Sequence, residues 1–123
     1  METKYEIQEG QYVFPYHHLV DCSRLSNTVT FYWGITYGGY VRKILEILRK
    51  QHFDSLLDVG CGDGKLILEV MKFAPNKNVV GIDPSERALA FARAFNFGNG
   101  AAFEAKEIGQ VTGVFNVLTV IET

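Results

Sequence analysis

The sequence predicts an α/β domain with a mostly parallel sheet, on the basis of three observations. Short apolar runs alternate along the chain with segments of helical periodicity, which is the order of a parallel sheet with crossover helices. The runs are apolar almost throughout, as in strands that are covered on both faces. The first run leads directly into a glycine-rich segment, the usual place for a ligand in such a fold. The predicted strands are residues 55–59, 78–83, 101–105 and 114–121.

Three amphipathic segments supply the predicted helices. The first lies within residues 36–53 and has apolar residues at the i, i+3, i+4 and i+7 spacing, namely Val41, Ile44, Leu45 and Leu48. The second covers residues 64–74. The third covers residues 84–98, where Pro84 suits the first helical turn and Gly98 suits the end of the helix. The second and third segments each connect one predicted strand to the next.

Length and composition indicate a single domain of the ordinary globular class. The chain has 123 residues, of which 47% are apolar and 21% are charged. Residues 1–34 are rich in aromatic side chains and lack periodicity, so we expect an arm or lid there, followed by a domain over residues 35–123. The net charge of -2 lacks the basic excess of most nucleic-acid-binding domains. Because the sequence shows neither a secretory signal nor a membrane-spanning run, we expect a cytoplasmic protein.

The glycine-rich segment, Asp58–Gly64, has the pattern D-x-G-x-G-x-G. Its glycines can adopt backbone conformations that are barred to other residues, and they let a ligand approach the main chain closely; they are Gly60, Gly62 and Gly64. The helix that follows would direct unpaired N–H groups and the positive end of its dipole into the same space. The segment therefore predicts a ligand site, with a plain tight turn as the alternative.

The spacing of residues argues against two cofactor classes and a metal site. A dinucleotide fingerprint, G-x-G-x-x-G, fails because Lys65 stands where the third glycine would be. A phosphate-binding P-loop, G-x-x-x-x-G-K-[ST], fails because Leu66 follows Lys65. The two cysteines, Cys22 and Cys61, lie far apart without the spacing of metal ligands, so no metal is predicted.

The segment "LLDVGCGDG" resembles motif I of class I S-adenosylmethionine-dependent methyltransferases, and the likeness extends through "VVGIDPSERALAFAR" and "FNVLTVIE". It covers roughly residues 38–123. The resemblance implies a Rossmann-like three-layer α/β/α sandwich that binds S-adenosylmethionine. Complete domains of this family have seven strands, so the resemblance also implies a domain that is incomplete after its fourth strand. An uncovered fourth strand would favour self-association through its edge.

The resemblance also implies a set of cofactor-binding residues, which are Asp58, Gly60, Cys61, Gly62, Gly64, Asp83, Pro84, Ala105 and Lys106. Asp58 and the glycines would cradle the methionine and ribose portions of the cofactor. Asp83 would bind the ribose hydroxyls, and Ala105 and Lys106 would lie beside the adenine. Structural alternatives stay open: Asp83 suits a helix N-cap followed by Pro84, and Asp58 suits a hydrogen bond within its own turn. For Cys61, the structural alternative is a small side chain that merely fits within the glycine-rich segment.

The catalytic residues are unknown from the sequence. A general base is needed only if the acceptor must lose a proton, and the candidates are His17, His18 and His52. Each of these histidines also suits a surface or structural role. The resemblance places the methyl-transfer cleft at the end of the fourth strand, at Val120, Ile121 and Glu122.

The resemblance implies methyl transfer to a small-molecule acceptor, because it is closer to methyltransferases of the ubiquinone-biosynthesis kind. An RNA methyltransferase is an alternative, because "VIE" is similar to the start of the E-x-x-E-H metal motif of RNA 2′-O-methyltransferases. Thr119 and Thr123 stand where that motif has its first glutamate and its histidine. A non-catalytic module that binds the cofactor or a partner chain is a further alternative.

Overall fold

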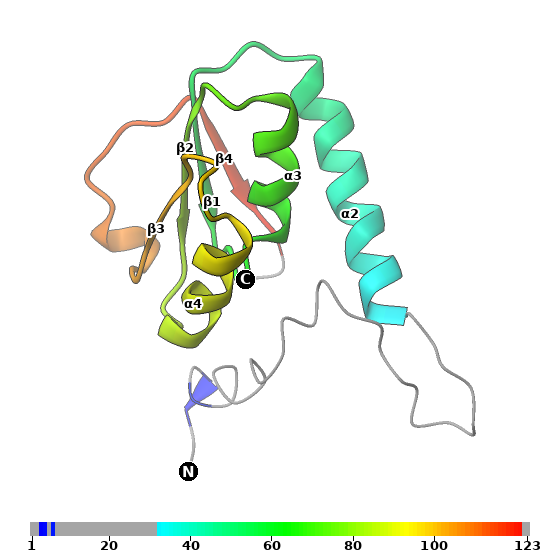
Figure 1. The fold of residues 1–123 in the computed structure, drawn as a ribbon. Helices are drawn as coiled ribbons and strands as arrows, with labels where there is room; N and C mark the ends of the chain where they lie inside the picture. Colours follow the sequence, from blue (N-terminus) through cyan, green and yellow to red (C-terminus); the bar gives the residue numbers. More distant parts are fainter. Residues whose placement is uncertain (1–2, 5, 7–31, 122–123) are drawn as a thin grey trace.

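The structure is a computed structural model that describes residues 3–4, 6 and 32–121. In this described part of the chain, four strands form one parallel sheet in the order β3-β2-β1-β4 (Figure 1). They are β1 (Ser55–Val59), β2 (Asn78–Ile82), β3 (Ala102–Glu104) and β4 (Val117–Val120). The predicted α/β class and the parallel sheet are confirmed.

Both β3 and β4 are shorter than the sequence predicts, and for β4 the cause is a side chain. Asn116 Oδ1 accepts hydrogen bonds from the backbone N–H groups of Asp54 and Ser55, at 2.8 and 3.1 Å. The N–H of Asn116 in turn donates to Ser55 Oγ, at 2.9 Å. These bonds occupy the start of β1 where a backbone ladder would otherwise continue, so β4 begins only at Val117.

Between residues 32 and 121, the α-helices that accompany the sheet are α2 (Tyr32–Arg49), α3 (Lys65–Phe73) and α4 (Glu86–Phe95). A short 3-10 helix, η1 (Ile108–Gln110), lies in the connection from β3 to β4. Because α3 and α4 link neighbouring strands in the same direction, right-handed crossovers place both helices on one face of the sheet (Figure 1). Helix α2 packs beside α3 and begins within the predicted arm. Most of that arm, residues 7–31, lies outside the described residues.

The main core fills the space between these helices and the sheet. Side chains alternate along a strand, so Leu56 faces the helices and Leu57 faces away from them. Fully buried side chains from α3 and α4 pack on the helical side, namely Leu66, Ile67, Val70 and Leu89. Burial of each such side chain stabilises the fold by about 1.5–3 kcal/mol. The core therefore fixes the positions of β1 and β2, whose ends carry the glycine segment and Asp83.

Strand β4 lies at one edge of the described sheet. Leu118 and Val120 pair in register with Leu57 and Val59, on the face away from the helices, and are 54% and 60% exposed. The apolar edge predicted for the fourth strand is present, and self-association through it stays a prediction. Among the helices of the described residues, none has the length and apolar character needed to span a bilayer.

Candidate cofactor-binding site

The parallel sheet brings the predicted site residues together at the carboxyl ends of its strands. The glycine loop follows β1, Asp83 follows β2, and Ala105 follows β3, so all of them lie at the carboxyl ends of adjacent strands. Direct bonds join the segments. The N–H groups of Gly60 and Cys61 donate to Ile82 O at 2.8 and 3.0 Å, and the N–H of Asp83 donates to the carbonyl of Glu104 at 3.3 Å. Open α/β sheets bind their ligands at this carboxyl end of the strands.

The glycine loop turns the chain from β1 into α3 through left-handed conformations. The φ angles are 70° at Gly60, 57° at Gly62 and 78° at Gly64, values that residues with a side chain rarely adopt. Gly64 is the N-cap of α3 and offers no side-chain acceptor to the first helical turn, which also lacks an acidic residue. The first N–H groups of an α-helix have no partner within the helix, and the helix dipole favours an anionic group near them.

Asp58 lies beneath this loop with its carboxyl group buried. It is 2% exposed, and its Oδ1 accepts a hydrogen bond from Thr119 Oγ1 of β4 at 2.8 Å. The pKa of Asp58 is raised to about 7: burial raises it most, the Thr119 hydrogen bond lowers it, and the charge of Asp83 raises it. The carboxyl group bonds across the sheet, rather than within its own turn as the alternative interpretation proposed.

Asp83 joins the glycine loop to the end of β2. Its Oδ2 accepts a hydrogen bond from the N–H of Gly62 at 3.0 Å, and its Oδ1 accepts one from the N–H of Ser85 at 2.8 Å. The carboxyl group is therefore engaged by the loop, and it does not cap the following helix. The N-cap of α4 is Ser85, whose Oγ accepts from the N–H of Ala88 at 3.1 Å.

The helix therefore begins later than the sequence predicts. Pro84 lies before α4, is exposed, and does not occupy its first turn. The alternative interpretation of Asp83 as the N-cap was wrong, because its carboxylate accepts from the N–H groups of Gly62 and Ser85, and Ser85 caps the helix.

The thiol of Cys61 points into the protein interior. It is 2% exposed, and a Cβ atom built at Gly81 would lie 2.8 Å from Cys61 Sγ, so the sulfur sits against the middle of the sheet. Burial raises the pKa of the thiol well above its ordinary value, and the nearby charges of Asp58 and Asp83 add to the effect. The backbone N–H of Cys61 bonds to Ile82 O and its carbonyl accepts from the N–H of Gly64, while its side chain fills the core.

We expect Cys61 to resist alkylation in the folded protein, because only an accessible thiolate reacts readily. Iodoacetamide labelling followed by peptide mass spectrometry, in buffer and in urea, measures this directly. Labelling of Cys61 should appear only as the protein unfolds. Rapid modification under native conditions would contradict the buried placement.

The remaining predicted residues separate into near and distant groups. Ala105 is exposed at the end of β3, and Lys106 Nζ forms an ion pair with Glu104 Oε2 at 2.5 Å. His52 precedes β1 at the opposite edge of the sheet, is 85% exposed, and lies 3.8 Å from Asp54 Oδ1. Its position argues against a role as general base. Val120 and Ile121 lie at the end of β4. His17, His18 and Glu122 fall outside the described residues.

Two buried polar side chains that sequence reasoning missed support the site. Thr119 is directly opposite Asp58 in the β1–β4 register. Asn96 Nδ2, just beyond α4, donates to the carbonyl of Gly64 at 3.3 Å and to that of Ala92 at 2.9 Å, which ties α4 to the glycine loop. A polar residue inside an apolar strand or at a helix end was the available signal for each, although its partner lies far away in the sequence.

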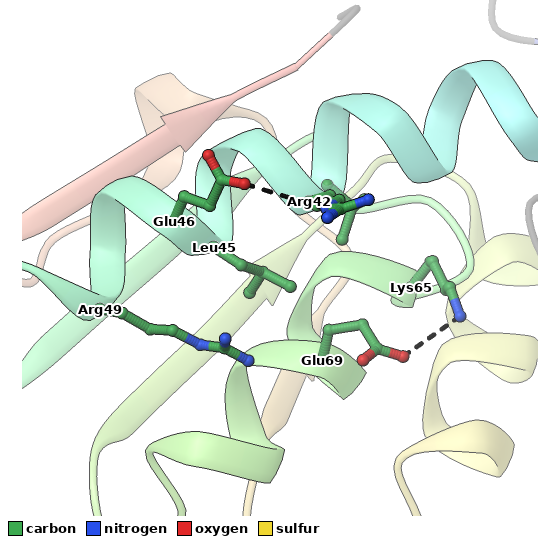
Figure 2. Close-up of a pocket in the computed structure, with 7 residues that line it drawn as sticks. Arg42, Leu45, Glu46, Arg49, Lys65 and Glu69 are labelled. Carbon is green, nitrogen blue, oxygen red and sulfur yellow. Dashed lines mark hydrogen bonds and ion pairs between the residues drawn. The ribbon is translucent and has the colours of Figure 1, made fainter.

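A groove of about 470 Å³ runs between α2 and α3, and Lys65, which directly follows the glycine loop, is one of its lining residues (Figure 2). Its charged side chains interact within the groove wall. Lys65 Nζ lies 3.2 Å from Glu69 Oε1, and Arg42 Nε lies 3.9 Å from Glu46 Oε1 (Figure 2). Arg49 also lines this groove, and its guanidinium stacks 5.2 Å from the centre of the Phe73 ring. The charged side chains of the groove therefore have partners within the protein, and the groove gives no indication of a ligand site.

Comparisons with known sequences agree with this geometry. Residues 51–122 match the family described as "Methyltransferase domain". Ribosomal RNA large subunit methyltransferase G of Shewanella putrefaciens is 43% identical over 53 residues, which are 43% of this chain and 14% of that protein. The same enzyme of Shewanella loihica is 42% identical over 52 residues, or 42% of this chain and 13% of that protein. The match thus spans only a small part of these relatives.

Solved structures show the same fold. The plantazolicin methyltransferase BpumL, in complex with S-adenosylhomocysteine, superposes with a TM-score of 0.52 and 26% identity over 69% of this chain and 32% of that one. Magnesium protoporphyrin IX methyltransferase of Synechocystis, with bound S-adenosylmethionine, gives a TM-score of 0.60 and 18% identity over 79% and 51%. The family match covers more than half of the chain, and with the shared fold it shows that the chain belongs to the Rossmann-like, S-adenosylmethionine-dependent methyltransferase domains.

Proposed function

We propose that this chain binds S-adenosylmethionine at the carboxyl ends of β1 and β2 and serves in methyl transfer. The observation that carries the proposal is the arrangement of the glycine loop between two buried carboxyl groups, with Gly62 bonded to Asp83 and Asp58 beneath the loop. The spacing of glycines in the sequence supports the same site. The chain covers only 14% of the Shewanella putrefaciens enzyme and 32% of BpumL, so the complete methyl-transfer activity is part of this proposal.

The chemistry of the donor set fits the amino-acid portion of this cofactor. That portion carries a carboxylate and an ammonium group. The first turn of α3 offers backbone N–H groups to the carboxylate, and Asp58 offers a carboxylate to the ammonium. We assign the ribose hydroxyls to Asp83, whose buried carboxylate lies at the end of β2 beside the glycine loop and accepts from the N–H of Gly62. Ala105 and Lys106, at the end of β3, would lie beside the adenine.

The contribution of this chain to catalysis is positioning. The bound cofactor supplies a methyl group that is already electrophilic. The loop and the two carboxyl groups fix that group in space, and orientation of the reacting groups can supply up to about 7–11 kcal/mol of the barrier reduction. Val120 and Ile121, at the end of β4, would line the side of the cleft that faces the acceptor. The predicted arm would cover the cofactor as a lid.

A small-molecule acceptor is the first candidate, as the resemblance of the sequence motifs implies. RNA is the second candidate, favoured by the identity of 43% to ribosomal RNA methyltransferases over 53 residues. Transfer of labelled methyl groups from S-adenosylmethionine, measured separately on bacterial RNA and on a small-metabolite extract, discriminates between the two. Cofactor binding without transfer to either pool would favour the non-catalytic alternative.

We expect the chain to bind S-adenosylhomocysteine with a stoichiometry of one, because the fixed loop and carboxyl groups form one site. Isothermal titration calorimetry of the folded protein measures this. Adenosine and homocysteine, titrated separately, serve as controls, and each should bind more weakly because it reaches only part of the site. Absence of binding by protein with a cooperative unfolding transition would overturn the proposed function while leaving the fold intact.

A further inference from the structure

Thr119 is a buried polar residue in a strand that is otherwise apolar. It is 8% exposed and lies in the middle of β4, next to β1 in the sheet. Parallel pairing places it directly opposite Asp58, on the face toward the helices. The pairing joins residues 61 positions apart in sequence, so it depends on β4 lying beside β1.

The hydroxyl group of Thr119 makes a directed bond to the site. Its Oγ1 donates to Asp58 Oδ1 at 2.8 Å. Among the described residues, Thr119 is the only hydrogen-bond partner of the Asp58 carboxyl group, and it occupies one of the two oxygens. Oδ2 keeps its accepting capacity for another donor. A carboxyl group that is held on one side presents the other oxygen in a defined direction.

The surroundings of Asp58 otherwise disfavour its ionised form. The Asp83 carboxyl group approaches from the end of β2, and the buried thiol of Cys61, which faces the core, also interacts electrostatically with Asp58. Burial and the charge of Asp83 both raise the pKa of Asp58, while the Thr119 hydroxyl lowers it. Thr119 therefore provides the described contact that favours the charged carboxylate.

We propose that Thr119 is a positioning residue for the cofactor: its hydroxyl holds Asp58 Oδ1, so that Oδ2 meets the ammonium group of the bound S-adenosylmethionine. This inference rests on the proposed function, since it assumes that Asp58 faces the cofactor. It extends the site to β4, from which the motif resemblance assigned no cofactor ligand. Thr119 acts through Asp58 and needs no contact with the cofactor itself.

The test compares Thr119→Val, which removes the hydroxyl in nearly the same volume, with Thr119→Ser, which keeps the hydroxyl. Thr112→Val is the matched control, since Thr112 is exposed in the loop before β4. Calorimetry with S-adenosylhomocysteine is carried out between about pH 5.5 and 8, a range that brackets the titration of Asp58. Circular dichroism confirms that each variant is folded.

In the wild type, affinity should rise with pH as Asp58 loses its proton, because the carboxylate binds the ammonium group. Thr119→Val should weaken binding about tenfold at neutral pH, the effect expected for loss of a hydrogen bond to a charged group. It should also move the rise in affinity to higher pH, because the hydroxyl no longer favours the charged form. Thr119→Ser should restore both properties, and Thr112→Val should match the wild type.

Carboxyl-carbon NMR of the cofactor-free protein separates the two layers of the argument. The titration of Asp58 should shift to higher pH in Thr119→Val, whether or not a ligand binds. An unchanged titration together with unchanged affinity in Thr119→Val would overturn the proposal about Thr119 alone. Equal losses in the serine and valine variants would do the same. Failure of the wild type to bind S-adenosylhomocysteine would overturn the proposed function and this proposal with it.

Discussion

Replacement of Asp83 by alanine should both destabilise the fold and abolish measurable cofactor binding. The N–H groups of Gly62 and Ser85 donate to the two oxygens of Asp83 in a buried setting, at 3.0 and 2.8 Å. Each donor that loses its acceptor costs about 1–3 kcal/mol, so we expect the free energy of unfolding to fall by roughly 2–6 kcal/mol. Urea denaturation followed by circular dichroism measures the loss. Calorimetry with S-adenosylhomocysteine measures the affinity.

Two further variants separate the structural role of Asp83 from its proposed role in binding. Asp83→Asn keeps one accepting oxygen, so its loss of stability should be about half that of the alanine variant. Asp54→Ala removes an aspartate whose side chain is 78% exposed at the opposite edge of the sheet, and should change stability by no more than about 0.5 kcal/mol. If Asp83→Ala kept both its stability and its affinity, the bonds that join the loop to β2 would carry no weight, and the site assignment would fail.

The alternation of apolar runs and helical segments was enough to predict β1, β2 and the helices α3 and α4 that follow them. The central residues of these helices and strands follow the local hydrophobic periodicity, which can be read directly from the sequence. The ends of elements depended on distant partners instead. The side chain of Asn116 bonds to the backbone of Ser55, so β4 begins only after Asn116. The N–H of Gly62 donates to the carboxylate of Asp83, and Ser85 caps the following helix instead. Neither partner can be inferred from the neighbouring residues alone.

The candidate site shows the same division. The conformations of Gly60, Gly62 and Gly64 agree with the prediction that this segment needs left-handed backbone. The contact between Asp58 and Thr119 required the strand order, because β4 follows β3 in sequence but pairs with β1. The inward direction of the Cys61 thiol depends on the conformation of the loop, which hydrophobic periodicity cannot predict.

Replacement of Gly64 by alanine should cost about 2–5 kcal/mol of stability, through two separable causes. The first is its φ angle of 78°, since a side chain in the left-handed region costs about 1–2 kcal/mol. The second is crowding. A Cβ atom would lie 2.7 Å from Asn96 Nδ2 and 3.0 Å from the Cβ of Ala92. Overpacking of this kind costs about 1–3 kcal/mol. Asn96 cannot yield freely, because its amide donates to the carbonyls of Gly64 and Ala92.

Two other glycines of this chain allow these causes to be measured apart. Gly98 has the same φ of 78°, but a Cβ atom at this position would meet no other atom within 4 Å, so Gly98→Ala should show the backbone cost alone. Gly39 lies within α2, has neither restriction, and Gly39→Ala should raise stability by about 0.5–1 kcal/mol. Urea denaturation should rank the three variants with Gly64→Ala lowest and Gly39→Ala highest. Equal losses at Gly64 and Gly98 would show that Asn96 yields without cost, and that the tie between α4 and the glycine loop contributes nothing to the rigidity of the site.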